Sequence, residues 1–267
     1  MHAIVRAATA HAASTRVAVA SFREHHPDAR LTVLVCDPLA PATPIEGAEV
    51  ISARDLVIGT TAEGTPVRFI DAWLAGGPEF ARWAVVPAAI EATSRSAYEA
   101  AGSGEAGSGN DDRILVLPGA AVVLAPLDDL VTATDTPLAL SPRGFDASAG
   151  MGSGGWVPDL AVVDPGATAL LAAWRAAAVE SLLDEHPAVD PDDPWATFAT
   201  SGDGVGTLTD PGVRLSPRSV GALDLELVAD TDAEADAGTV TVDGARARLV
   251  QFPAFDPARP WWYSTGP

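Results

Sequence analysis

The residues of this sequence that could do acid–base, metal or nucleophilic chemistry are few and scattered. The chain of 267 residues contains five histidines and one cysteine, and only His25 and His26 lie close together. We expect this pair in the last turn of a helix, where a cation complements the helix dipole. Cys36 follows an apolar run and is expected in the core, since one cysteine forms neither an intramolecular disulfide nor a zinc cluster. Ser153 is no nucleophile elbow, because Met151 stands where the G-x-S-x-G pattern needs glycine.

Two further patterns could bind a ligand, and each has a plainer reading. Gly102–Gly107 has the spelling G-x-G-x-x-G, but it follows a helical pattern and precedes a strand, the reverse of a dinucleotide site. We expect segment 101–112, AGSGEAGSGNDD, to be a flexible surface loop. Trp261–Tyr263 could stack on a base or sugar, or could anchor the C-terminal tail. Asp128 stands where a helix N-cap is wanted.

The charge of the chain excludes some classes of partner. Sixteen basic residues against thirty-six acidic ones leave a net charge of −20. Such a surface argues against nucleic acid and anionic lipid as partners, although it leaves room for a local anion site. No apolar stretch reaches the roughly 20 residues of a membrane span, and residues 1–22 do not read as a signal peptide. We therefore expect a cytoplasmic protein.

Strand and helix patterns alternate along the chain, which predicts an α/β fold with one mixed sheet. Ile4–Thr9, Ser14–His26 and Leu31–Val35 read as strand, helix and buried strand. A helical pattern over Phe69–Ser96 is interrupted at Gly76–Pro78. The other expected elements are strands at Glu49–Ile51, Arg113–Leu117, Ala121–Leu124, Leu138–Leu140 and Leu160–Val163, helices from Asp128 and at Ala167–Leu183, and a hairpin of Thr239–Val242 with Arg246–Phe252 around Asp243-Gly244.

Three phrases in order carry a resemblance to a known family. They are residues 21–30, SFREHHPDAR, which lead into Leu31–Asp37; residues 114–130, ILVLPGAAVVLAPLDDL; and residues 251–257, QFPAFDP. With this spacing the sequence resembles, over roughly residues 3–260, the GT-A-fold nucleotide-sugar glycosyltransferases of bacteria, in their glycogenin- and galactosyltransferase-like branch. The resemblance implies a GT-A-like, Rossmann-type three-layer sandwich with a mixed, mostly parallel sheet. It also implies a single domain of residues 1–267, with residues 1–130 as the nucleotide-binding half and 131–267 as the acceptor-side half.

The resemblance also indicates where a metal would bind in the family. There, a divalent cation such as manganese is held by an Asp-x-Asp motif after a central strand and by a C-terminal histidine, and it neutralises the leaving diphosphate. These three positions fall on Pro118, Ala120 and Gln251, which are not metal ligands of that kind. We therefore expect neither a metal nor another cofactor.

The nucleotide-sugar contacts that the resemblance implies are Thr9, Arg16, Arg82, Pro118, Gly119, Ala120 and Gln251, with the two arginines facing phosphate. It implies no catalytic residue. Two functions follow: metal-independent binding or transfer of a nucleotide sugar, or a catalytically inactive pseudo-glycosyltransferase that acts as partner or scaffold of an active enzyme. A third reading is a likeness of fold alone, with an unrelated small-molecule site in the crevice of the sheet.

Overall fold

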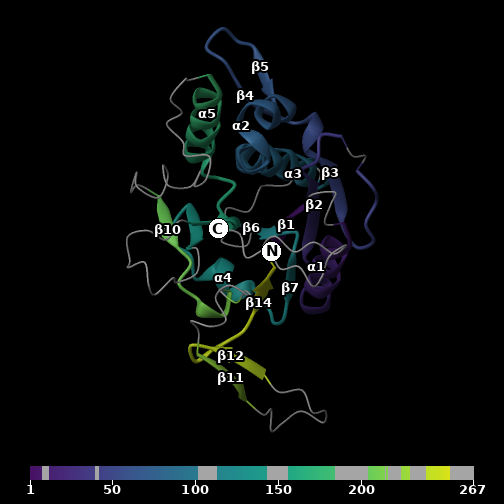
Figure 1. Cartoon of the computed structure of the whole chain (residues 1–267), viewed down its shortest axis with the longest axis vertical. Helices are drawn as coiled ribbons and strands as arrows, with labels where there is room; N and C mark the ends of the chain where they lie inside the picture. Colours follow the sequence, from purple (N-terminus) through teal and green to yellow (C-terminus); the bar gives the residue numbers. More distant parts are fainter. Residues whose placement is uncertain are drawn as a thin grey trace.

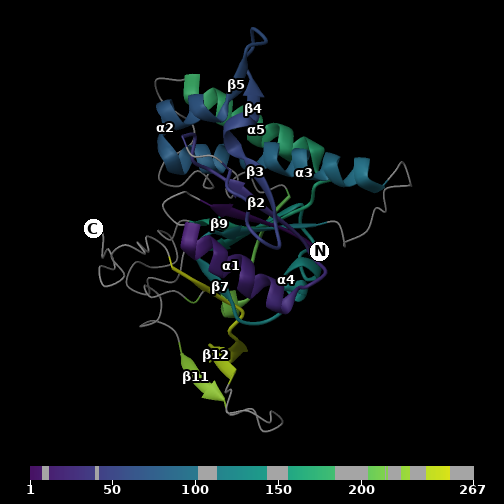
Figure 2. The same cartoon turned by 90° about the vertical axis from the view of Figure 1, so that its right-hand side faces the viewer.

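The centre of the molecule is a seven-stranded β-sheet with helices on both faces (Figures 1 and 2). In this computed structural model the residues described are 1–7, 12–39, 42–101, 113–142, 156–183, 204–213, 215, 224–228 and 239–252. The strands of the sheet are β1 (His2–Ala7), β2 (Arg30–Val35), β3 (Glu49–Ser52), β6 (Ile114–Pro118), β8 (Leu138–Pro142), β9 (Trp156–Val163) and β10 (Val205–Thr207). Their order is β10-β8-β9-β6-β1-β2-β3, and of these seven strands only β9 runs antiparallel to its neighbours. The predicted mixed, mostly parallel sheet is confirmed.

The three central strands, β2, β1 and β6, are buried almost throughout, as their continuous apolar sequences predict. Successive side chains alternate between the two faces of the sheet. Ile4, Leu34 and Val116 therefore belong to one core and Val5 and Val33 to the other. This alternation divides the interior into two apolar layers, one on each side of the sheet.

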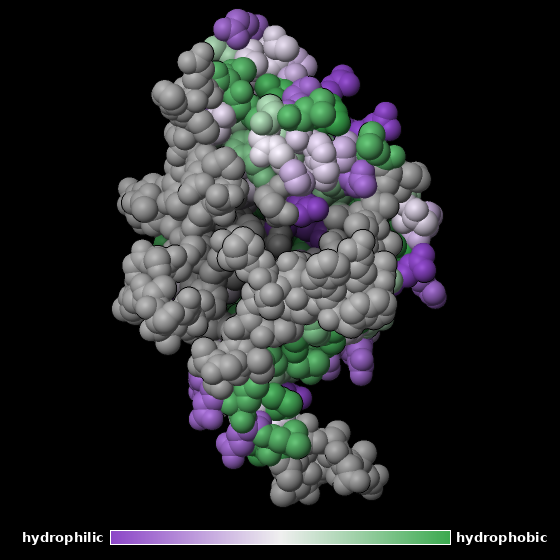
Figure 3. All heavy atoms as spheres, in the orientation of Figure 1, coloured by the Kyte–Doolittle hydropathy of each residue, from purple (hydrophilic) through white to green (hydrophobic). Residues whose placement is uncertain are grey.

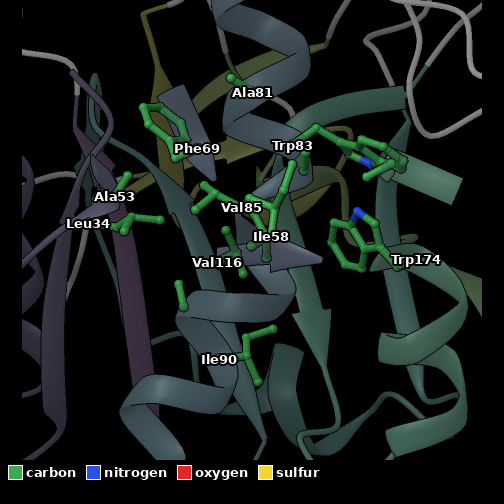
Figure 4. Packing of buried hydrophobic residues seen from close by; sticks show 14 of the residues in the cluster. Leu34, Ala53, Ile58, Phe69, Ala81, Trp83, Val85, Ile90, Val116 and Trp174 are labelled. Atoms are coloured by element: carbon green, nitrogen blue, oxygen red, sulfur yellow. The ribbon is translucent and has the colours of Figure 1, made fainter. Parts of the chain in front are cut away.

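The first layer is made by three helices, α2 (Phe69–Ala84), α3 (Val86–Ala101) and α5 (Thr168–Leu183), which cover one face of the sheet (Figure 2). Trp83 and Trp174 are fully buried here, with ring centroids 5.7 Å apart (Figure 4). The predicted interruption falls inside α2, where Gly77 has a φ of 81° that L side chains rarely adopt. The helical stretch also has a second break that was not predicted, because α2 ends at Ala84 and α3 begins two residues later.

The second layer covers the opposite face with α1 (Ala12–His25), α4 (Asp128–Thr132), β7 (Ala121–Val123) and β14 (Leu249–Gln251) (Figure 2). Ala18, Val19 and Phe22 of α1 pack in this core. Strands β7 and β14 pair antiparallel beneath the main sheet. A short 3-10 helix, Pro211–Val213, buries Val213 in the same core.

His26 joins α1 to α4, and its environment corrects two predictions. Its ring is buried; Nε2 lies 2.9 Å from the Leu127 N–H, from which it accepts a hydrogen bond, and Nδ1 lies 3.4 Å from the Asp128 carboxylate. Burial lowers the pKa of His26, against the opposing effect of Asp128. His26 is therefore a neutral acceptor, whereas we predicted a cation at a helix end. Asp128 is the first residue of α4 rather than its N-cap, which is Leu127.

A β-hairpin that the sequence did not indicate stands at the outer end of the first layer. Strands β4 (Val57–Thr60) and β5 (Pro66–Arg68) pair antiparallel after a 3-10 turn at Ala53–Asp55. Arg175 of α5 donates to the carbonyl oxygens of Ile58 (3.0 Å) and Val57 (3.2 Å), and pairs with Glu91 of α3. One side chain thus connects the hairpin to two helices.

A small antiparallel sheet projects from the other end of the molecule (Figure 1). It consists of β11 (Leu225–Val228), β12 (Thr239–Val242) and β13 (Ala245–Arg246). The predicted turn at Asp243-Gly244 is present, with φ of 48° and 79°. The predicted hairpin partner is wrong in part, because Leu249–Gln251 leaves this sheet and pairs with β7. Leu249 is fully buried in the second core, which an exposed hairpin would not provide.

The structure also bears on the predictions for Cys36 and for membrane-spanning helices. Cys36 is buried, as expected. Three predictions lie outside the described residues: those for segment 102–112, for Ser153 and for Trp261–Tyr263. Among the helices that the structure describes, none combines the length and hydropathy needed to cross a bilayer.

Candidate functional site

The order of the strands places a site at the carboxyl ends of β1 and β6. From β1 the chain proceeds outward to β2 and β3, and then returns to the other side of β1 as β6. In open α/β sheets ligands bind outside the carboxyl ends of the strands at such a reversal, because the two connections diverge there and leave a crevice. The residues at this point are Arg6, Ala7, Pro118 and Gly119.

Gly119 lies against the end of β1 in a contact that only glycine permits. A Cβ built on Gly119 would lie 2.3 Å from the carbonyl oxygen of Arg6 and 3.2 Å from the Cα of Ala7. The backbone of the β6–β7 connection therefore rests directly on the end of β1. The Phe252 N–H, donating to the carbonyl oxygen of Ala120 at 2.8 Å, ties β14 to the same connection.

Four of the predicted site residues thus come together: Pro118, Gly119, Ala120 and Gln251. Gln251 pairs with Ala121 in the β7–β14 ladder. Its side chain is buried, and Nε2 donates to the carbonyl oxygen of Val213 at 3.0 Å. Gln251 is thus held by the backbone of the second layer.

The two predicted arginines lie on opposite sides of the sheet. Arg82 is half-buried in the last turn of α2, within the first layer. Arg16 is exposed on α1, which belongs to the second layer. Thr9 lies outside the described residues. Of the two arginines, Arg82 is the one that a hydrogen bond connects to the end of β1.

That contact comes from Arg6, a residue that our sequence reasoning missed. Arg6 is 5% exposed, and Nη1 donates to the carbonyl oxygen of Arg82 at 3.1 Å. Arg6 is opposite Leu34 and Pro118 in the two ladders, and it points to the same face as Ile4, toward α2. The available signal was a single charge inside the apolar strand AIVRA, which a surface position would explain equally well.

The resemblance implies a divalent ion at positions that fall on Pro118, Ala120 and Gln251. Pro118 and Ala120 have no side-chain oxygen, and the Nε2 of Gln251 donates to Val213, which leaves Oε1 as the one side-chain oxygen of the three residues. Within the described ranges, no three His, Cys, Asp or Glu side chains gather as metal ligands would. Guanidinium groups such as that of Arg6 bind anions through charge-assisted hydrogen bonds.

Comparisons with known proteins found similar solved structures but no family model and no curated relative. Among solved structures it is similar to galactosyltransferase LgtC in complex with donor and acceptor sugar analogs, with a TM-score of 0.46 and 17% identity over 99% of this chain and 90% of that chain. It is also similar to glycosyltransferase GlyE of Streptococcus pneumoniae TIGR4 (TM-score 0.44, 15% identity, 79% of this chain, 45% of that chain) and to mouse xyloside xylosyltransferase 1 (TM-score 0.49, 9% identity, 96% and 98%).

This chain has an α/β fold with a seven-stranded, mixed and mostly parallel central sheet. It spans less than half the length of GlyE. Identities of 9–17% set no correspondence between individual residues, so the role of each side chain follows from contacts within this chain.

Proposed function

We propose that the chain binds a nucleotide sugar at the carboxyl ends of β1 and β6 and does so without a metal ion, as a metal-independent transferase would. One observation carries this proposal: at the chain reversal of the sheet, in a protein whose net charge is −20, the guanidinium of Arg6 on β1 donates to the backbone carbonyl of Arg82. A diphosphate needs local positive charge, and guanidinium groups supply it through charge-assisted hydrogen bonds. Arg16, which is exposed on α1, is proposed as a further phosphate contact.

We also propose that the two halves of the chain bind different substrates. Residues 1–130 contain β1, α2 and β6, and are the nucleotide-binding half; residues 131–267 are the acceptor-side half. We also propose a cytoplasmic location, which the one cysteine of the sequence supports, since proteins of reducing compartments do not depend on disulfides.

The test is a titration of the chain with UDP-sugars and GDP-sugars, in EDTA and in manganese, followed by calorimetry and by a turnover assay. The proposal expects binding that is the same under both conditions. Binding or turnover that requires manganese would show that the three substituted positions are not the metal site of the family.

A second candidate is a partner or scaffold of an active glycosyltransferase. The observation that favours it is the projecting sheet, on which Leu225, Leu227 and Val228 are 38, 72 and 42% exposed. In Figure 3, apolar and hydrophilic side chains lie side by side on the described part of this end of the molecule. Exposed apolar surface of this kind is common at protein interfaces. Absence of nucleotide binding, together with co-purification of an active glycosyltransferase that Leu227→Asp abolishes, would support this candidate over the first.

A further inference from the structure

We propose that the chain has a second binding site, in a pocket between α3, α5 and the β4–β5 hairpin, and that this site takes a neutral polyhydroxylated ligand, a mono- or disaccharide. The pocket has a volume of about 320 Å³ and is lined by Gly59, Thr60, Glu91, Ala172, Arg175 and Ala176. None of these residues belongs to β1 or β6, so the inference does not rest on the proposed nucleotide-sugar site.

The walls of the pocket come from three elements that hold one another in place. Helix α5 contacts both α3 and β4, and α3 contacts β4; Figure 2 shows the three at the same end of the molecule. At Gly59 the strand rests directly on α5, because a Cβ built there would lie 2.5 Å from Cγ2 of Val179. Small-molecule sites have volumes of about 300–1,000 Å³, so a pocket at the lower end of this range suits a small ligand.

The ion pair in the pocket keeps unused hydrogen-bonding capacity. Arg175 donates through Nε to the carbonyl oxygen of Ile58, through Nη2 to that of Val57, and through Nη1 to Oε2 of Glu91. A guanidinium has five N–H donors, so two of them, and Oε1 of Glu91, have no partner among the described residues. The side chains of Arg175 and Glu91 are 25 and 40% exposed, which leaves both open to a ligand in the pocket that they line.

The charges of the pocket favour a neutral ligand. The Glu91 carboxylate and the Arg175 guanidinium pair with each other, so together they carry no net charge. An anion would meet the Glu91 carboxylate and a chain whose net charge is −20, and a cation would meet the Arg175 guanidinium. A hydroxyl group both donates and accepts, so a polyol can donate to Oε1 of Glu91 and accept from Arg175 while the ion pair stays intact.

The rest of the lining suits the C–H face of a sugar ring. Ala172 and Ala176 are one turn apart on the same side of α5, and both are exposed. With Gly59 they give the pocket a small apolar surface beside the ion pair. Apolar surface with a few polar groups that fix orientation is the usual composition of a small-molecule site. A sugar ring matches it, with hydroxyl groups around its rim and C–H groups on its faces.

The test measures the binding of glucose, galactose and maltose to the whole chain at millimolar concentrations, by saturation-transfer NMR. Ala176→Leu fills the pocket and leaves Arg175 and Glu91 in place. Ala173→Leu is the matched control, because Ala173 is also exposed on α5 but does not line the pocket. Glu91→Ala is a second variant, which removes the free carboxylate oxygen. Inorganic phosphate and UDP are added as competitors.

We expect millimolar binding of a sugar to the wild-type chain, and binding about tenfold weaker or more to Ala176→Leu and Glu91→Ala. Ala173→Leu should bind as the wild-type chain does, and neither phosphate nor UDP should displace the sugar. If Ala176→Leu does not fold, as circular dichroism would show, Glu91→Ala decides by the same criterion.

The opposite results overturn the assignment. Absence of binding of all three sugars, or equal binding to the wild-type chain and a folded Ala176→Leu chain, overturns the pocket and leaves the proposed nucleotide-sugar site standing. Displacement by phosphate overturns the neutral class of ligand. Displacement by UDP assigns the sugar to the nucleotide site instead of the pocket. A chain that binds these sugars but no nucleotide overturns the proposed function alone.

Discussion

Replacing Gly119 by alanine should disturb both the stability of the fold and the proposed site. The φ of Gly119 lies outside the left-handed region, so alanine meets no torsional barrier there. The whole cost comes from its Cβ, which would lie 2.3 Å from the carbonyl oxygen of Arg6, 1.1 Å inside the 3.4 Å at which ordinary contact begins. Since the opposing atoms belong to the backbone of β1, the clash is relieved only by moving the β6–β7 connection away from β1.

Overpacking of this kind costs about 1–3 kcal/mol. For a protein of this size that corresponds to a fall in Tm of roughly 2–10 °C, measurable by calorimetry or by circular dichroism during heating. The same displacement moves Gly119 away from Arg6, so we also expect weaker binding of UDP or GDP. The matched control is Gly64→Ala at the tip of the β4–β5 hairpin. Gly64 has a φ of 83° and open space around it, so its substitution costs about 1 kcal/mol through strain alone and leaves nucleotide binding intact.

An unchanged Tm and an unchanged diphosphate affinity in Gly119→Ala would refute the close contact of the β6–β7 connection with β1. Loss of stability with intact affinity would refute only the link between this contact and the ligand. Both outcomes are read from one variant and its control.

Three further perturbations test the packing. Burial, with smaller effects of Arg30 and the N-terminus, lowers the pKa of His2 from 6.5 to about 4. As the pH falls, the His2 imidazole is therefore protonated in the unfolded chain before it is protonated in the folded chain. Stability should therefore fall by up to about 3 kcal/mol between pH 6.5 and pH 4, a slope that His2→Gln removes from urea titrations over that range. Trp174→Ala should lower the free energy of unfolding, measured by urea titration, by about 3–5 kcal/mol. An unchanged free energy of unfolding would contradict the burial of the Trp174 ring. Arg175→Ala should cost about 1–3 kcal/mol and raise hydrogen exchange in the β4–β5 hairpin, whereas uniform exchange would contradict its role as a connection.

The sequence predicted those parts of the fold in which local pattern and tertiary environment agree. Continuous apolar runs identify β2 and β6 because both faces of these strands are buried. Helix α5 follows from apolar side chains at helical spacing, of which Leu171, Trp174 and Ala178 are buried. The sequence did not predict the β4–β5 hairpin because its strands are short and the side chain that bonds to its backbone, Arg175, is more than a hundred residues away.

The site was predicted less completely, for a physical reason. The resemblance pointed to Pro118, Gly119, Ala120 and Gln251, which the fold does bring together. The role of Arg6 was not predicted, because its guanidinium donates to a backbone carbonyl 76 residues along the chain. Every residue has such a carbonyl, so the sequence does not show which one is the acceptor. The buried acceptor role of His26 toward Leu127 was missed for the same reason.

The net charge of −20 opposes the binding of an anion, so a buried cation such as the Arg6 guanidinium matters for the proposed site. A diphosphate approaching this chain meets a repulsive long-range field, which salt at physiological strength reduces beyond about 8 Å. Within that distance, local groups decide whether the anion is held. An exposed arginine such as Arg16 is screened by the same ions that weaken the repulsion, whereas the charge of Arg6, 5% exposed, is screened far less. For the metal-independent binding that we propose, Arg6 at the end of β1 is the buried cation that this fold provides.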